Sequence, residues 1–240
     1  MTKRYGNYKV VNVQSAEASL LSQALLPDPE CLFNQGENVD SGRESNVCDR
    51  VKVAVEKRFY FIKRYNCRGW KYRLKNMFRI SRAQRAMQAG QALQDCGIRT
   101  PQVLVCLEER RFFLLGSSYL VCPFLDDTVS LLELWPRLDD KRREEFLRQA
   151  AGLFGIMHRH GIVHGDSNWR NILVRNPSEK PELWFVDLDG SRRYRRLSFA
   201  RAERDIGHFL RDLTRSGADE KSVQLFRNDW ERSLMLTGVF

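Results

Sequence analysis

The sequence predicts an α+β fold of two lobes, a strand-rich first half that holds one helix and a helix-rich second half. Short runs rich in β-branched and aromatic residues gather before residue 125, whereas the strongest helical periodicity comes after it. The chain has 240 residues, 42% of them apolar and 29% charged, which is typical of a globular protein with a sizeable core. We therefore expect lobes over residues 1–125 and 126–240 that together form one domain, with a ligand cleft at their hinge.

In the first half, a β-hairpin is expected before the helix. Val51–Val55 and Phe59–Tyr65 alternate between apolar and polar side chains, as paired antiparallel strands do. Ser81 can cap the N-terminus of the helix, and Gly97 can end it. Three short strands are expected to follow, over residues 103–107, 111–115 and 119–125.

The clearest helix belongs to the second half. Asp139 can cap it, Gly161 follows its last turn, and apolar residues recur between them at helical spacing. Two short strands are expected after it, over residues 172–174 and 183–186, and then helices from about residue 199 onwards.

The positive charge is concentrated in one segment. The chain has 40 Lys and Arg residues against 30 Asp and Glu, a net charge of +10. Residues 57–85 hold eleven of the basic residues and no acidic one, so acidic residues slightly outnumber basic ones in the rest of the chain. Such a segment points to a polyanion, whether phosphate, nucleic acid or an anionic membrane surface.

The sequence also argues against a membrane-spanning protein, a secreted protein and a zinc-binding protein. No apolar run approaches the roughly 18 residues that span a bilayer, and no signal peptide is evident. The six cysteines form no CxxC pair, so we expect reduced thiols and no structural zinc site.

The residues with the strongest chemical signal follow the long helix. In the run His164-Gly-Asp-Ser-Asn-Trp-Arg-Asn, Asn171 comes five residues after Asp166 and leads into a short strand. Kinases use this spacing, in which the Asp orients the attacking hydroxyl and the Asn side-chain oxygen binds a metal ion. Each feature alone is common in loops, and only their order and spacing indicate phosphoryl transfer.

A second acidic residue completes this pattern. Sixteen residues after Asn171, an apolar strand delivers Asp187, in the position of the second metal ligand. Oxygen ligands of this kind suit Mg²⁺, which neutralises charge on the transferred phosphoryl group.

On these motifs the chain resembles the bacterial lipopolysaccharide core kinases, the Kdo and heptose kinase family, within the wider protein-kinase-like fold. The resemblance implies an N-lobe of antiparallel sheet plus one helix, a mainly helical C-lobe, and ATP bound between them. It covers about residues 31–213 and is carried by Tyr60-Phe-Ile-Lys-Arg-Tyr, Ser81-Arg-Ala, Gly97-Ile-Arg-Thr-Pro, the 164–171 loop, Val186-Asp-Leu-Asp-Gly and Arg204-Asp-Ile.

The resemblance assigns nucleotide-binding roles in the first lobe. Lys63 matches the strand lysine that contacts the α- and β-phosphates, with a solvated strand lysine as the alternative. Gly36 and Gly42 fall where a loop would cover the phosphates, although an ordinary turn explains them nearly as well. Main-chain groups near Cys122 and Phe124 would meet adenine.

The resemblance also implies supporting residues in the second lobe. Asp205 matches the buried Asp that braces the catalytic loop by hydrogen bonds, with a helix N-cap as the alternative. His164 and Asp189 are expected to support the same site.

One departure from the family pattern concerns the partner of the strand lysine. Kinases usually pair it with a Glu on the N-lobe helix, but no Glu occurs between Glu56 and Glu108, and the expected position aligns near Ala86. We expect an altered active geometry or reduced activity of the kinase.

The resemblance implies an ATP-dependent kinase that phosphorylates a heptose or Kdo hydroxyl of the lipopolysaccharide inner core. The 53 residues after Asp187 are too few for peptide-docking helices, which favours a compact acceptor over a protein. We expect a peripheral protein at the cytoplasmic face of the inner membrane that binds no nucleic acid. The basic residues expected to meet the glycolipid or the anionic membrane, unless they form only a solvated face, are Arg68, Lys71, Arg73 and Lys75.

Two other functions stay open at this point. A soluble small-molecule kinase of the aminoglycoside or choline type would use the same catalytic loop, but the arginines after Asp187 favour an anionic acceptor. A pseudokinase or other non-catalytic polyanion-binding module could use the basic segment, with aromatic side chains stacking on bases. The intact set of oxygen ligands argues against this third function.

Overall fold

The computed structural model of the chain describes residues 2–12, 15–26, 28–39, 48–177 and 181–235. Its contacts group into two units, Met1–Gln88 with Pro101–Leu125, and Ala89–Thr100 with Asp126–Phe240. From the sequence, residues 89–100 were expected in the first lobe. They group with the second unit because Leu93 and Ile98 are buried in its core, and the Phe185 N–H donates to the Arg99 carbonyl.

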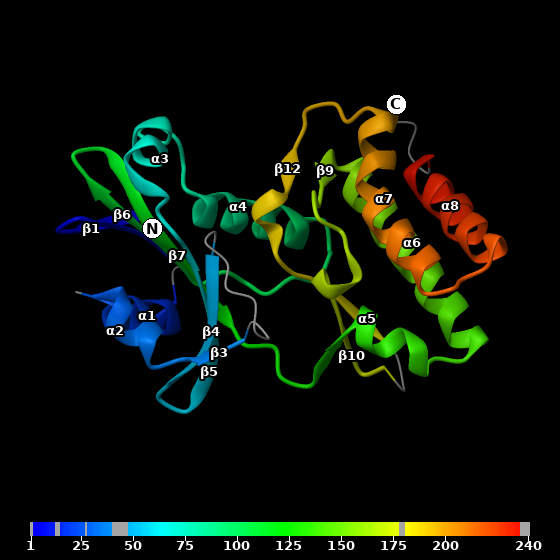
Figure 1. The fold of residues 1–240 in the computed structure, drawn as a ribbon, viewed down its shortest axis with the longest axis horizontal. Helices are drawn as coiled ribbons and strands as arrows, with labels where there is room; N and C mark the ends of the chain where they lie inside the picture. The colour runs from blue at the N-terminus through cyan, green and yellow to red at the C-terminus, as the bar shows by residue number, and fades with distance from the viewer. Residues whose placement is uncertain (1, 13–14, 27, 40–47, 178–180, 236–240) are drawn as a thin grey trace. The chain divides into compact units, whose positions relative to one another are not determined.

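The first unit is built on a seven-stranded antiparallel sheet of order β1-β2-β6-β7-β5-β4-β3 (Figure 1). Alternate side chains of its strands are buried in two clusters, one on either side of the sheet. The strands are β1 (Thr2–Tyr5), β2 (Tyr8–Asn12), β3 (Glu37–Asn38), β4 (Cys48–Val55), β5 (Arg58–Tyr65), β6 (Val105–Arg111) and β7 (Leu114–Pro123).

Helices cover the sheet of the first unit. The Ser15 hydroxyl caps α1 (Ala16–Leu25) and the Asp28 carboxylate caps α2 (Pro29–Asn34), each by accepting a backbone N–H of the first turn. Together with α3 (Gly69–Lys75), these helices were not predicted from the sequence. The expected helix is α4 (Arg82–Asp95), and the Ser81 hydroxyl accepts the Gln84 N–H at its start.

One of the two expected strand patterns of this sheet is confirmed and the other is wrong. The hairpin of β4 and β5 forms as expected, with Glu56 at positive φ in its turn. The three short strands expected over residues 103–125 are two long ones, because Phe112 and Phe113 both adopt left-handed conformations and form the turn between β6 and β7.

The second unit is mainly helical. Its helices are α5 (Leu131–Leu134), α6 (Asp140–Arg159), α7 (Phe199–Arg215), α8 (Glu220–Met235) and the second half of α4, with short 3₁₀ turns η1 (Trp135–Arg137), η2 (Trp169–Asn171) and η3 (Leu188–Gly190). Its strands form two small antiparallel sheets, β11 (Glu182–Phe185), β10 (Ile172–Arg175) and β8 (Thr128–Ser130) in one, β9 (Ile162–Val163) and β12 (Arg192–Arg193) in the other.

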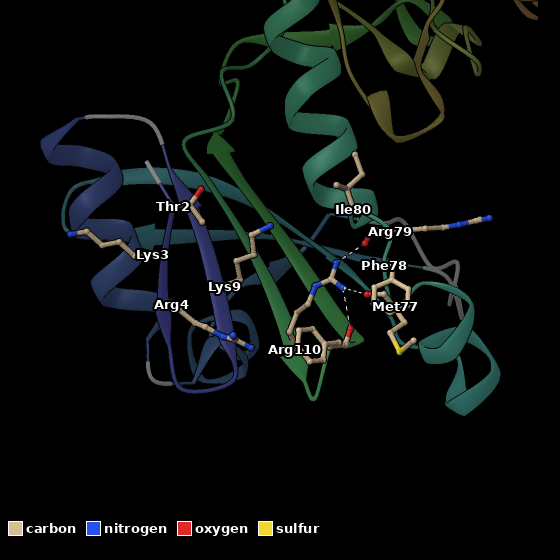
Figure 2. A pocket seen from close by; sticks show the side chains of 10 residues that line it. Thr2, Lys3, Arg4, Lys9, Met77, Phe78, Arg79, Ile80 and Arg110 are labelled. Atoms are coloured by element: carbon tan, nitrogen blue, oxygen red, sulfur yellow. Dashed lines mark hydrogen bonds between the residues drawn. The ribbon is translucent and has the colours of Figure 1, made fainter.

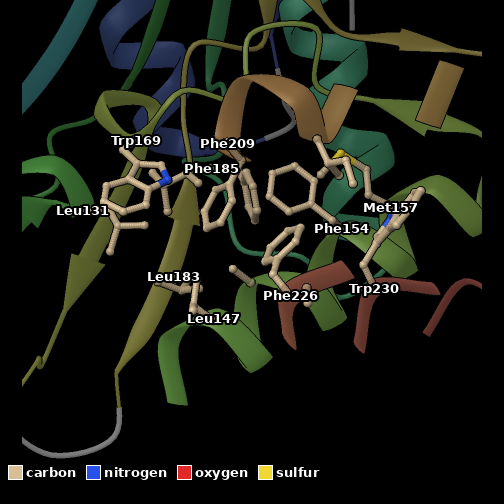
Figure 3. Packing of buried hydrophobic residues seen from close by; sticks show 14 of the residues in the cluster. Leu131, Leu147, Phe154, Met157, Trp169, Leu183, Phe185, Phe209, Phe226 and Trp230 are labelled. Carbon is tan, nitrogen blue, oxygen red and sulfur yellow. The ribbon is translucent and has the colours of Figure 1, made fainter. Parts of the chain in front are cut away.

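Aromatic rings fill the core of the second unit (Figure 3). Phe154 of α6 lies edge-on to Phe185, Phe209 and Phe226, and the last two rings stack 4.6 Å apart. Such rings bury a large apolar area in defined geometry. This core fixes α6, α7 and α8 around the loop that carries Asp166 and Asn171.

Candidate active site

The loop between β9 and β10, residues 164–171, is fixed to helix α7 at several points. The Asp205 carboxylate accepts the backbone N–H groups of His164 and Gly165, each at 2.7 Å. The Ser167 hydroxyl donates to the Asp205 carbonyl, and the Trp169 N–H donates to the Asp212 carboxylate at 2.8 Å. Asp205 lies inside α7, which begins at Phe199, so it is not the helix N-cap considered as the alternative.

A third donor and a tryptophan complete the surroundings of Asp205. The His158 Nε2 lies 3.0 Å from its carboxylate, and the Trp230 Nε1–H donates to His158 Nδ1, which makes Nε2 the protonated nitrogen of His158. Burial alone would raise the pKa of Asp205, but the hydrogen bonds from His158 and the Gly165 N–H outweigh it and hold this pKa below its usual value. The carboxylate is therefore ionised at neutral pH.

His164 is the buried first residue of this loop. Its Nε2 lies 3.1 Å from the Val186 carbonyl, and its Nδ1 accepts the Asp166 N–H at 3.3 Å. These partners specify a neutral ring with its proton on Nε2. Burial lowers the pKa of His164, which outweighs the nearby carboxylates of Asp205, Asp187 and Asp166.

The loop also approaches η3 closely. Gly165 has φ +83°, and a Cβ atom built on it would lie 2.5 Å from the Gly190 carbonyl oxygen. The Ser191 hydroxyl donates to the His164 carbonyl at 2.8 Å. Glycine at position 165 therefore satisfies both a left-handed backbone and a backbone contact that no side chain permits.

Asp166 and Asn171 face each other across this loop. The Asn171 amide nitrogen donates to the Asp166 carbonyl at 2.9 Å and lies 3.3 Å from its carboxylate. The Asp166 carboxylate is exposed and accepts a further bond from the Asn168 amide at 2.8 Å. This orientation of Asn171 leaves its side-chain oxygen as the atom that can bind a cation.

Asp187 follows β11 directly and adopts φ 62° and ψ 56°. A non-glycine residue rarely adopts this left-handed conformation, and such strain gathers at functional sites. The neighbouring Val186 N–H donates to the Asn171 carbonyl at 3.0 Å, so the backbones that carry Asn171 and Asp187 are joined. Asp189 is half-buried within η3, two residues further on.

In the first unit, Lys63 occupies β5 between β4 and β7. It is only 4% exposed, and its ammonium lies 4.9 Å from the centre of the Tyr65 ring. A lysine this buried is not the solvated strand lysine considered as the alternative. The Ala86 side chain is likewise buried on α4, and α4 carries no Glu.

The other residues assigned to the nucleotide differ in what surrounds them. A Cβ on Gly36 would lie 2.7 Å from Val51, so this glycine allows close packing against β4, and Gly42 lies outside the described residues. Burial raises the pKa of the Cys122 thiol to about 12. The Phe124 N–H donates to the Phe59 carbonyl at 3.0 Å, which leaves its carbonyl as the main-chain group for a ligand.

Glu108 of β6 is a buried acid on this sheet that was not predicted from the sequence. Its carboxylate accepts the Ser81 N–H at 2.9 Å and lies 3.3 Å from Arg110 and 3.5 Å from Lys9. Burial would raise the pKa of Glu108, but these partners lower it below the usual value. A Glu within the otherwise apolar run Val-Cys-Leu-Glu was the available signal.

The basic residues expected to meet the acceptor or membrane are not equivalent. Arg68, Lys71 and Lys75 are exposed, whereas Arg73 is half-buried, with its Nε 3.2 Å from the Cys67 sulfur and its guanidinium 3.8 Å from Glu109. Arg73 therefore has a structural role within the first unit.

The described residues show neither a cluster of metal-binding side chains nor a membrane-spanning helix. In that part of the chain, no three His, Cys, Asp or Glu side chains are grouped so that they could hold a metal ion. No helix there has the length and apolar composition of a membrane span.

Comparison with known proteins decides the family. Residues 31–235 match the Lipopolysaccharide kinase (Kdo/WaaP) family. The chain belongs to this family. It is therefore an ATP-dependent lipopolysaccharide kinase, as the resemblance implied, whereas the catalytic-loop motif alone predicted only phosphoryl transfer.

Two individual proteins are similar to this kinase. Its fold is similar to that of the solved structure of WaaP in complex with acyl carrier protein, with a TM-score of 0.70, 19% identity and coverage of 93% of this chain and 88% of that one. The two-lobed, protein-kinase-like α+β fold is thus confirmed. The serine/threonine-protein kinase greatwall of Gallus gallus is 33% identical over 63 residues, which span 25% of this chain and 7% of that protein.

Proposed function

We propose that this kinase transfers the γ-phosphoryl group of ATP to a sugar hydroxyl, of heptose or Kdo, in the inner core of lipopolysaccharide. The observation that carries the proposal is the second unit's loop, in which α7 fixes the backbone beneath an exposed Asp166 and a neighbouring Asn171. Catalysis of phosphoryl transfer consists mainly of such positioning and of electrostatic stabilisation.

Asp166 is the catalytic residue in this proposal. Its exposed carboxylate orients the acceptor hydroxyl and takes its proton as the new phosphate ester bond forms and the bond to ADP breaks. Asn168 and Asn171 donate to the same side chain, so they restrict its rotamer without burying it. Asp205 acts as a positioning residue through the backbone of His164 and Gly165.

Mg²⁺ would be held by the Asn171 oxygen and the Asp187 carboxylate. This donor set fits, because Mg²⁺ is usually bound by one or two protein oxygens together with substrate phosphates and water. When bound, the ion neutralises charge on the phosphates. Asp187→Asn should raise the Mg²⁺ concentration needed for half-maximal activity and weaken Mn²⁺ binding measured by electron paramagnetic resonance. Unchanged Mn²⁺ binding would remove Asp187 from the metal site.

Lys63 would contact the α- and β-phosphates, and main-chain groups near Cys122 and Phe124 would contact adenine. Burial of Lys63 in the sheet supports the first role, since a lysine in low-dielectric surroundings interacts strongly with phosphate. Gly36 itself is packed against Val51 of β4, so it would not contact the phosphates directly. Its role would be to allow the chain that follows it to approach them.

An anionic acceptor is supported by exposed arginines that follow Asp187 in the second unit. They would bind core phosphates or carboxylates, preferably in bidentate fashion. With this acceptor, we expect the kinase to act at the cytoplasmic face of the inner membrane. These arginines are Arg192, Arg193, Arg195, Arg196 and Arg201.

The test is phosphorylation of purified lipopolysaccharide with an unphosphorylated core, followed by mass spectrometry of the core sugars. Wild-type protein should add one phosphate, and the fragment masses distinguish heptose from Kdo. Asp166→Asn should lower kcat by about 10²- to 10⁴-fold, with ATP binding kept. The matched control is Asp140→Asn on the exposed first turn of α6, which should keep wild-type turnover. Near-normal turnover of Asp166→Asn would refute the role of this carboxylate.

A further inference from the structure

The first unit exposes a group of large apolar side chains around the β6–β7 turn. Phe78 is 84% exposed, Phe112 82%, Phe113 68% and Trp70 70%, and Leu74 is also exposed. Single exposed apolar residues are ordinary, but a group of five at neighbouring segments marks a site of interaction. We call these five residues the aromatic patch.

The β6–β7 turn consists of residues that rarely form such a turn. Arg111 pairs with Leu114, so Phe112 and Phe113 form a two-residue hairpin loop with φ 47° and 67°. Asn and Gly are the residues that favour such a turn, whereas phenylalanine rarely adopts positive φ. Two phenylalanines that are strained and also exposed contribute little to folding, which indicates a function outside the fold.

Arg110 fixes the turn to the segment that carries Phe78 (Figure 2). Its guanidinium donates to the carbonyls of Phe113 at 3.2 Å, Met77 at 2.8 Å and Arg79 at 2.6 Å, and it lies 3.3 Å from Glu108. The backbones on either side are therefore joined through one buried ion pair. Phe78 and Phe113 also border the same cavity of about 460 Å³.

Helix α3 extends the aromatic patch. It packs against β7, yet none of its side chains is buried. Trp70 and Leu74 stand at i and i+4 and so share one face of the helix. Lys71 and Lys75 follow each of them by one residue and are exposed. Tryptophan, leucine and lysine in this arrangement are typical of helices that lie in the plane of a membrane interface.

Positive charge surrounds the aromatic patch. The nearby acids are engaged within the unit, Glu108 with Ser81, Lys9 and Arg110, and Glu109 with Arg73 and the Ser117 N–H. The exposed basic residues of the same segments and of the neighbouring β1 strand are Lys3, Arg4, Lys71, Lys75, Arg79 and Arg111.

We propose that the aromatic patch is the membrane-docking surface of this kinase and that its occupant is an anionic lipid bilayer. The turn and α3 would insert Phe112, Phe113 and Trp70 into the interface, and the basic residues would bind lipid phosphates. Exposed apolar side chains at a hairpin tip and on a helix, with lysines and arginines beside them, have the composition of an interfacial membrane anchor, which favours the bilayer. This inference does not depend on the phosphotransfer proposal, because binding is measured without ATP or acceptor.

The test is co-sedimentation of the full chain with vesicles of phosphatidylcholine, alone or mixed with phosphatidylglycerol. Wild-type protein should bind the mixed vesicles in a salt-dependent manner and the neutral vesicles weakly. The variant F112N/F113G should lower the partition coefficient about 10- to 100-fold. It places the favoured residues in the turn, so its melting temperature should equal or exceed that of the wild type, and loss of binding cannot be ascribed to unfolding.

The matched control is Phe59→Ser. Phe59 is 49% exposed and precedes the strand residue Tyr60, which pairs with Pro123 at the opposite end of β7 from the turn. This variant should bind vesicles like the wild type. Equal binding by F112N/F113G and wild type would overturn the proposal. It would also be overturned if a soluble oligonucleotide or a protein, and not vesicles, required Phe112 and Phe113 for binding.

Discussion

Single residues of the second unit make several contacts that fix the catalytic loop. The Asp205 carboxylate accepts two backbone N–H groups of the catalytic loop and faces His158, so one charge fixes three donors. Hydrogen bonds to a charged group contribute about 1.5–3 kcal/mol each. Position 165 requires glycine, because a Cβ atom there would collide with the Gly190 carbonyl oxygen. The loop geometry thus depends on the backbone as much as on the reacting side chains.

Gly165→Ala tests that dependence. The substitution forces a Cβ into a position 2.5 Å from the Gly190 oxygen and strains a φ of +83°, so it should destabilise the protein by about 2–4 kcal/mol and lower kcat. Gly152→Ala is the matched control, since a Cβ there meets nothing within 4 Å in the interior of α6. That variant should gain about 0.5–1 kcal/mol. Urea unfolding measures both, and equal stabilities would contradict the proposed backbone contact.

At the scale of elements, the sequence predicted those whose signals are local. The β4–β5 hairpin shows clear alternation, and α4 and α6 have side-chain caps at Ser81 and Asp139. The separate strands expected over residues 111–115 and 119–125 were wrong for a local reason as well. Phe112 and Phe113 favour a strand by propensity, yet the chain reverses there, held by Arg110 and by pairing of β6 with β7.

Elements fixed by distant contacts were not predictable in this way. Helix α2 is held to the sheet because Glu30 binds Arg64 and accepts the Tyr119 hydroxyl, partners far away in sequence. Glu108 is similar, since its carboxylate holds the start of α4 from a strand 27 residues later. The spacing of Asp166, Asn171 and Asp187 was visible in the sequence. The connection of Asp205 through His158 to Trp230 required the fold.

For the whole molecule, only some residues of the basic segment 57–85 are exposed, and Lys63 is buried in the sheet. Arg64 and Arg73 are engaged in contacts within the first unit, with Glu30 and Asp49 and with Cys67 and Glu109. Others are exposed beside the aromatic patch. Net charge alone therefore overstates the charge available to a polyanion, and the exposed subset decides where an anionic surface can bind.

Part of the acid sensitivity of the whole molecule follows from two buried groups, His164 of the catalytic loop and Asp205 that supports it. Burial lowers the pKa of His164 below its ordinary value of 6.5. When the pH falls below 6.5, the unfolded chain therefore takes up a proton that the folded chain excludes, and the free energy of unfolding decreases as the pH decreases. The slope should approach about 1.4 kcal/mol per pH unit for this one group. Asp205, whose pKa is also lowered on folding, adds a second loss that begins only as pH falls below its ordinary value of 3.8.

The measurement is urea unfolding between about pH 7.5 and pH 5, the window in which the His164 effect acts. His164→Gln keeps a side chain that can accept the Asp166 N–H and donate to the Val186 carbonyl, but it cannot titrate. Its stability should therefore depend less on pH than that of the wild type. His160→Gln, at the exposed end of α6, is the control and should keep the wild-type slope. Parallel profiles for the wild type and His164→Gln would mean that proton exclusion from the catalytic loop does not govern acid unfolding.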